Sequence, residues 1–232
     1  MSRIPKQWFS EEWWKKEIEQ TFEKSLIPLA SICGLECPVC SSKDFCVKDY
    51  LYKHDFGGPI VISVGMCSKC GYRNVDVSVA EPHEPARIIV VVAKPEDLDS
   101  LVVKNSKAAI IFPELGLEMW PGPASTGVIT TIEGFLLRFR EVLDCLCKQQ
   151  GADKNECMKR RRMIDWALER RDRRFADERY VMVLDDPEGV SYVYGERVLI
   201  TALTENVDYL EVAREAKETI GWIEANQKIL DI

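Results

Sequence analysis

The amino-acid sequence predicts a mainly β protein with added α-helices, and three patterns support this fold class. Short runs of alternating or continuous β-branched residues recur between residues 45 and 129, separated by Gly, Pro and Asn breaks. Two Cys-x2-Cys pairs flank the first of these runs. Between about 130 and 174, apolar residues instead recur every three or four positions, which is typical of helices.

Residues 1–32 are expected to form an N-terminal helical segment. Its apolar residues recur every four positions and therefore share one helical face: Trp14, Ile18, Phe22 and Leu26. Ser10 is suited to cap the N-terminus of this helix. The segment is unusually aromatic, and we expect it to dock on the rest of the protein, with an anchor for a partner as the alternative.

Two cysteine pairs, Cys37 with Cys40 and Cys67 with Cys70, are separated by 26 residues. Each pair can direct two sulfurs at one ion, and Zn²⁺ prefers four ligands in a tetrahedron. Two disulfides or a redox-active pair are the alternatives, but a redox pair needs only one motif, close to a βαβ pattern that the sequence lacks. Residues 33–82 are therefore predicted to form a zinc ribbon that holds one structural Zn²⁺.

The other cysteines and both histidines are not expected to bind this ion. Cys33 has the wrong spacing for a knuckle and Cys46 lies in a strand-like run, so both are predicted to be small buried side chains. The two histidines are expected in turns or on the surface: His54 and His83. Three cysteines flank a later loop: Cys145, Cys147 and Cys157. We expect these three to be free thiols, with a Cys147–Cys157 disulfide as the alternative if the source is a hyperthermophile.

A β body is expected over residues 83–203, after a Pro-rich connector. About seven short strands with frequent turns predict a β-sandwich or barrel-like arrangement. A helical hairpin is expected to interrupt the body at about 130–174, and its first helix should begin at a capping box formed by Thr130 and Glu133. A C-terminal helix is expected within residues 204–232.

Charge and hydropathy limit the function classes. The net charge is −7 and the pI is about 5.1, which weakens any claim that the whole surface binds nucleic acid. Residues 159–174 carry eight basic and three acidic residues, a net charge of +5, so the remainder carries −12. The sequence opens without a secretory leader, and no apolar run approaches the ~18 residues that cross a bilayer. We therefore expect a cytoplasmic protein.

The order of several segments resembles one known family. A two-knuckle ribbon runs into "CGYRNVDV", followed by Pro-Glu-Leu, Pro-Gly, Thr-Ile-Glu-Gly and Asp-Asp-Pro segments, all within residues 33–195. In combination these resemble the ZPR-type zinc-finger family, whose eukaryotic members bind elongation factor 1-alpha and carry two copies of the module. One module is present here, so the chain is similar to a single-module, archaeal-type member.

The resemblance implies a zinc ribbon followed by a double-stranded β-helix (jelly-roll-like) body with an inserted helical hairpin. It places the zinc ligands at Cys37, Cys40, Cys67 and Cys70, and it implies elongation factor 1-alpha as the partner. The Trp-rich N-terminus and the final helix lie outside it, so no role is transferred to them.

Catalysis is not expected from these residues. Two histidines cannot form the histidine cluster that holds a catalytic metal in many β-helix bodies, and no G-x-S-x-G, Walker or dinucleotide motif occurs. Asp185 and Asp186 could act as acid and base, but Asp-Pro-x-Gly more often forms a turn. Glu114 is expected either to face a partner or to belong to a structural turn.

Two binding functions remain. The basic segment is interleaved with Asp165, Glu169 and Asp172, which is typical of a solvated, salt-bridged helix face, so an RNA-binding accessory factor of translation or transcription is the alternative. The favoured function is a protein-interaction module, an adaptor or chaperone for elongation factor 1-alpha that binds without catalysis. A rigid ribbon would present Tyr72 and Arg73 in fixed positions, which reduces the entropy lost on association.

Overall fold

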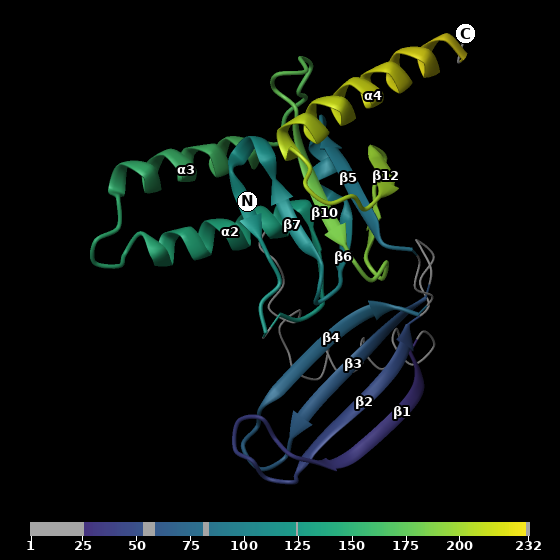
Figure 1. The fold of residues 1–232 in the computed structure, drawn as a ribbon, viewed down its shortest axis with the longest axis vertical. Helices are drawn as coiled ribbons and strands as arrows, with labels where there is room; N and C mark the ends of the chain where they lie inside the picture. The colour runs from purple at the N-terminus through teal and green to yellow at the C-terminus, as the bar shows by residue number, and fades with distance from the viewer. Residues whose placement is uncertain (1–25, 53–58, 81–83, 124, 231–232) are drawn as a thin grey trace, which may run out of the picture. The chain divides into compact units, whose positions relative to one another are not determined.

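The computed structural model describes residues 26–52, 59–80, 84–123 and 125–230 (Figure 1). The chain divides into two compact units, Met1–Glu81 and Pro82–Ile232, and each is described by itself. Within the described ranges, no helix is long and apolar enough to cross a membrane. Most of the predicted N-terminal helical segment, together with His54 and His83, lies outside the described residues.

The first unit contains a four-stranded antiparallel sheet in the order β1-β2-β3-β4. The strands are β1 (Leu26–Leu35), β2 (Phe45–Tyr52), β3 (Ile60–Cys67) and β4 (Arg73–Val79). One Cys-x2-Cys pair lies between β1 and β2, and the other lies at the turn from β3 to β4, which is the arrangement of a zinc ribbon.

The helix prediction for residues 26–32 is wrong, because these residues belong to β1. Leu26 pairs with Tyr52 and Ile32 pairs with Val47, so the backbone finds its hydrogen-bonding partners in β2. Pro28 has no N–H to donate within a helix, which favours the strand at this position. The four-residue spacing of apolar residues that ends at Leu26 therefore does not predict the structure of residues 26–32.

Cys33 and Cys46 are not the two small buried side chains that the sequence predicts. They form a disulfide between β1 and β2, with their Cα atoms 4.1 Å apart. Cys33 is exposed and Cys46 is half-buried. The prediction failed because Cys33 pairs across the ladder, a contact that spacing along the chain does not show.

The second unit has two antiparallel sheets in the described residues. The larger has the order β12-β5-β10-β7-β8 and the smaller β11-β6-β9. Their bounds are β5 (Ala86–Val92), β6 (Leu101–Lys104), β7 (Ala109–Phe112), β8 (Leu117–Met119), β9 (Val128–Thr131), β10 (Tyr180–Asp186), β11 (Tyr192–Tyr194) and β12 (Val198–Ala202). Two 3₁₀ helices, η2 (Pro95–Asp99) and η3 (Pro113–Leu115), connect strands.

Three α-helices complete this unit: α2 (Ile132–Leu146), α3 (Lys154–Ala167) and α4 (Tyr209–Leu230). The α2–α3 hairpin is inserted between β9 and β10 and extends to one side of the sheets, whereas the first part of α4 packs on the larger sheet and its C-terminal end projects beyond it (Figure 1). The predicted mainly β body with an inserted helical hairpin is therefore confirmed.

The central strands β5 and β10 are buried on both faces. Along β5, Ile88 and Val90 point into a core shared with the smaller sheet and the hairpin, while Ile89 and Val91 point into a second core under α4. Successive strand residues face opposite sides, so a continuous apolar run is what a doubly covered strand requires. The "RIIVVV" segment supplies that run.

The start of α2 differs by one residue from the predicted capping box. Thr131 is the N-cap, and its hydroxyl accepts a hydrogen bond from the Gly134 N–H at 3.1 Å. Thr130 instead remains in β9, paired with Val102, and Glu133 pairs with Arg170. A Cβ at Gly134 would lie 2.0 Å from the Thr130 hydroxyl oxygen, so a larger residue here would force Thr130 to move.

The second helix ends earlier than the basic segment suggests. α3 ends at Ala167, and the buried Arg173 folds back to donate hydrogen bonds to the carbonyls of Trp166 and Ala167 at 2.8 and 3.1 Å. Its guanidinium also lies 4.3 Å from the centre of the Trp166 ring. Arg173 thus satisfies carbonyls that a helix end leaves without partners.

At the tip of the hairpin, Cys147 and Cys157 form a disulfide rather than the free thiols that we expected. Cys145 is a free, exposed thiol. The two bonded residues lie at the end of α2 and in the first turn of α3, which brings their Cα atoms to 5.9 Å. Antiparallel packing of the helices supplies this proximity, so the alternative pairing is the one observed.

The two disulfides predict a definite thiol count. Of the nine cysteines, five are free, so we expect five reactive thiols in denaturant with a chelator and nine after reduction. A Cys147→Ser/Cys157→Ser variant should again give five before reduction but seven after it. Ellman titration measures both counts. Nine thiols without reductant in the wild type would contradict the pairing.

Candidate metal centre

The two cysteine turns are built by the same backbone hydrogen bonds. In the first, the N–H of Ser41 donates to the Cys37 carbonyl at 2.9 Å, and the N–H of Cys37 donates to the Ser42 carbonyl at 2.8 Å. In the second, Gly71 and Tyr72 occupy the equivalent positions, with distances of 3.0 and 2.9 Å. Ser41 and Gly71 both have left-handed backbones, with φ of 54° and 75°. Glycine meets this requirement at little cost, whereas serine adopts it less readily.

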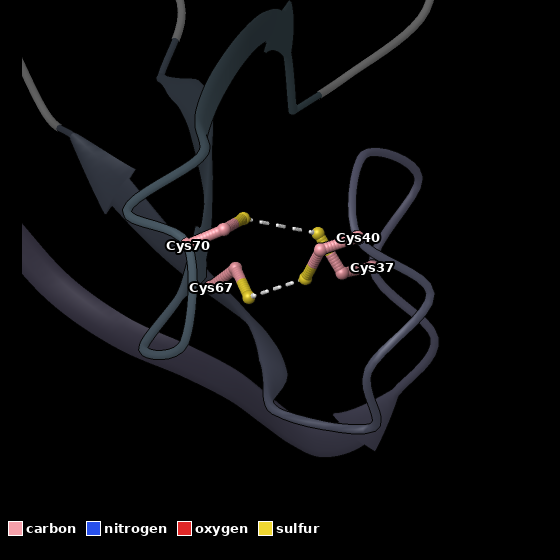
Figure 2. Close-up of side chains that lie close together, drawn as sticks. All are labelled: Cys37, Cys40, Cys67 and Cys70. Carbon is pink, nitrogen blue, oxygen red and sulfur yellow. Dashed lines mark hydrogen bonds between the residues drawn. The ribbon is translucent and has the colours of Figure 1, made fainter.

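These turns bring four sulfurs together. The Sγ atoms of Cys37, Cys40, Cys67 and Cys70 all lie within 4.8 Å of one another. Figure 2 shows the two pairs pointing toward each other from opposite turns. The sulfurs of Cys37 and Cys70, and those of Cys40 and Cys67, are 3.7 Å apart. A regular tetrahedron with zinc–sulfur bonds of about 2.3 Å has sulfurs about 3.8 Å apart, so the residues present fit a zinc ion.

The electrostatics of the cluster favour a cation. The N–H of Cys70 and the Ser42 hydroxyl lower the pKa of Cys67 to about 6, although burial opposes this shift. The N–H of Tyr72 acts in the same direction on Cys70, but burial and the neighbouring sulfurs, Cys40 first among them, outweigh it and raise the pKa of Cys70 to about 12. Without a cation the cluster therefore retains protons, since four thiolates at this distance would repel one another.

The expected contact residues lie directly beside the second turn. Arg73 is exposed at the start of β4 and pairs with Met66 in the ladder. Tyr72 is half-buried rather than fully exposed, because its ring lies 6.0 Å from that of Phe45. The turn thus holds Tyr72 against the sheet and leaves Arg73 exposed to solvent.

Asp185 and Asp186 have different structural roles, and neither carboxylate is free. Asp185 makes a buried two-point ion pair with Arg87 at 2.7 and 2.8 Å, and the Tyr209 hydroxyl donates to it at 2.7 Å. These three side chains line a pocket of about 560 Å³. Asp186 accepts hydrogen bonds from the N–H groups of Glu188, Val190 and Ser191. The preferred turn role is therefore confirmed for Asp186, and Asp185 is neutralised by Arg87.

Glu114 belongs to the structural turn. One carboxylate oxygen accepts a hydrogen bond from the Val181 N–H at 3.1 Å. The other makes no well-directed hydrogen bond in the described residues, although the Lys217 ammonium lies 3.0 Å away, so this contact is an ion pair. Glu114 thereby connects η3 to β10 and α4, which favours the structural role of the two that we expected.

The basic segment is extensively ion-paired. Arg161 lies 2.7 Å from Asp144, and Arg170 lies 2.7 Å from Asp99 and 3.0 Å from Glu133. Within the segment, Asp165 pairs with Arg161 and Glu169 with Arg171. The predicted salt-bridged face is confirmed, although several of its acidic partners come from other elements.

Comparison with known proteins agrees with this arrangement. Residues 96–220 match the family described as the ZPR1 jelly-roll domain. An uncharacterized ZPR1-like protein of Methanocaldococcus jannaschii is 34% identical over 178 residues, 76% of this chain and 88% of that protein. A ZPR1-like protein of Pyrococcus horikoshii is 32% identical over 73% of this chain and 76% of its own length.

A eukaryotic relative matches over a smaller share of its length. The zinc finger chaperone zpr1 of Schizosaccharomyces pombe is 30% identical over 68% of this chain, which corresponds to 34% of that protein. The chain thus spans most of the two archaeal relatives and about a third of the yeast one, as the expected single-module member would.

Removing the metal should unfold the ribbon and leave the body intact. Either a strong zinc chelator or the Cys67→Ser/Cys70→Ser variant should lower amide protection of β2 and β3 by about 100-fold or more, because the described residues show no disulfide between the two turns. β5 and β10 should keep their protection. Hydrogen exchange read by mass spectrometry measures both, and Cys145→Ser is the control. Unchanged ribbon protection would contradict a structural metal.

Removing the Asp185 carboxylate should destabilise the body strongly. Asp185→Ala leaves the Arg87 guanidinium buried without a counter-charge, which costs about 3–5 kcal/mol. Arg214→Ala, which removes exposed pairs with Glu211 and Glu218, should cost below about 1 kcal/mol. Native-state hydrogen exchange of β5 and β10 gives both values. Equal losses in the two variants would show that the buried pair is not needed.

Proposed function

The chain belongs to the ZPR1 family, and from that premise we propose that it is a zinc-binding protein-interaction module, an adaptor or chaperone for translation elongation factor 1-alpha that binds without catalysis. The observation that carries the proposal is the four-sulfur cluster joined to a sheet with very little core of its own. Such a unit is suited to presenting a surface, and its small size leaves little room to enclose a substrate.

One structural Zn²⁺ is proposed at Cys37, Cys40, Cys67 and Cys70. Four thiolates complete the preferred tetrahedral shell, so no position would remain for a reactive water. The metal would therefore supply rigidity. Fixing both turns before association reduces the conformational entropy that binding would otherwise cost.

The ribbon also exposes apolar surface that a partner could cover. Its exposed large apolar residues are Ile27, Leu29, Ile32, Leu35, Val39, Met66 and Val75. Strand β1, at the edge of the described sheet, contains no charged residue, so Pro28 and two register irregularities are what limit its pairing with other chains. Exposed apolar surface of this kind is typical of protein–protein contact sites. Arg73 would add a polar contact beside it.

The partner and the chaperone role rest on family evidence. The yeast relative is named a zinc finger chaperone, and the ZPR-type resemblance implies elongation factor 1-alpha. A cytoplasmic location follows from that partner as part of the same proposal. The β body would supply a second contact surface.

The RNA-binding alternative has less support. A nucleic-acid site needs basic side chains that are free to meet phosphates. In the segment 159–174, Arg160, Arg161, Arg170 and Arg171 are already paired with carboxylates, and Arg173 is buried.

A pull-down with purified elongation factor 1-alpha tests the proposal. We expect retention by the wild type, loss in Cys67→Ser/Cys70→Ser, and about tenfold weaker binding in Tyr72→Ala/Arg73→Ala, since Tyr and Arg often dominate interfaces. Leu210→Ala/Arg214→Ala removes a similar pair of exposed side chains from α4 and should bind normally.

Each outcome of the pull-down is informative. Equal retention by the cysteine variant would show that binding does not need zinc. No retention by the wild type would show that elongation factor 1-alpha is not the partner. Recovery of RNA from native extract, lost steeply as salt is added, would favour the alternative.

A further inference from the structure

The hydroxyl of Ser42 touches one sulfur from each half of the cysteine cluster. Its oxygen lies 3.3 Å from the Sγ of Cys40 and 3.6 Å from the Sγ of Cys67. Cys40 belongs to the first turn, and Cys67 lies 25 residues beyond Ser42 in the second. A single half-buried side chain therefore bridges the two knuckles without being a ligand.

The direction of this contact follows from the chemistry of a metal-bound cysteine. A zinc-bound thiolate has no proton, so in the loaded site both sulfurs can only accept, and the hydroxyl must donate. The hydroxyl has one proton, so it donates to Cys40, the nearer sulfur, and makes a weaker shared contact with Cys67. Hydrogen bonds to charged acceptors are stronger than those to neutral ones.

Donation to these sulfurs relieves a charge imbalance. Four thiolates around one divalent cation leave a net charge of −2, and donors that contact the sulfurs stabilise that charge. The Ser42 hydroxyl is placed to do this for one sulfur of each turn, at 3.3 Å from Cys40 and 3.6 Å from Cys67.

The backbone of Ser42 has a separate role that a side-chain substitution leaves in place. Its carbonyl accepts the Cys37 N–H at 2.8 Å and so closes the first turn. Replacing serine by alanine removes the hydroxyl and keeps this bond. Ser68 offers a matched control, because it follows Cys67 in the second turn and its hydroxyl lies 3.5 Å from the Asp44 carbonyl.

We propose that Ser42 is a positioning residue of the metal centre, whose hydroxyl bridges the two cysteine turns and strengthens binding of the ion. This inference rests on the proposed zinc site. It assigns a function to a residue outside the Cys-x2-Cys pattern.

Zinc transfer to a chromophoric chelator tests the inference. Metal analysis of the purified wild type first establishes whether one Zn²⁺ is present per chain. We then expect Ser42→Ala to bind zinc about tenfold or more weakly, because loss of an outer-shell partner typically costs 10–100-fold in metal affinity. Ser42→Thr, which keeps a hydroxyl, and Ser68→Ala should stay within about twofold of the wild type.

A spectroscopic measurement separates the hydroxyl contact from a general loss of structure. In Co²⁺-loaded protein, Ser42→Ala should shift the thiolate-to-metal charge-transfer bands, whereas Ser68→Ala and Ser42→Thr should not. Zinc affinity and band positions in Ser42→Ala equal to those of Ser68→Ala would overturn the role of Ser42 and leave the metal site standing. A wild type without stoichiometric zinc would overturn both.

Discussion

The cross-link formed by four cysteines is the constraint on which the ribbon depends. Among its described residues, the buried apolar side chains are Cys37, Ile60, Cys67 and Val77, and two of these belong to the cluster itself. So small a buried core contributes little stability, and small domains of this kind usually depend on disulfides or a metal.

The second unit is stabilised by burial of apolar side chains instead. Several residues that carry the family resemblance support this packing. Its larger sheet is covered on both faces, by α4 on one side and by the smaller sheet with the hairpin on the other. Glu114 and Asp186 accept hydrogen bonds from backbone N–H groups, and Gly134 allows close approach to Thr130. These motif residues satisfy backbone donors or steric limits, which explains specific residue types without requiring catalysis.

The sequence predicts features that depend on local spacing and misses those that depend on contacts between distant segments. Cys-x2-Cys spacing identifies the sulfur cluster because each turn is complete within a few residues. The continuous β-branched run in β5 likewise identifies a strand, although its burial on both faces is seen only in the structure. By contrast, the Cys33–Cys46 disulfide, the Arg87–Asp185 pair and the contact of Arg173 with the end of α3 depend on strand pairing and packing. The sequence does not indicate that Ser42 belongs to the site, because its contact with Cys67 exists only in the folded ribbon.

Replacement of a core by a metal has a consequence for binding. A sheet that relies on burial must direct its apolar side chains inward, as β5 and β10 do. A sheet fixed by an ion would be released from that requirement, so residues such as Leu29, Ile32 and Val75 could remain on the surface. A bound ion would also fix their positions before any partner arrives, which would lower the entropic cost of contact. The same ion would then account for both the stability of the ribbon and its recognition of a partner. The Ser42 hydroxyl, by helping to retain the ion, would support both.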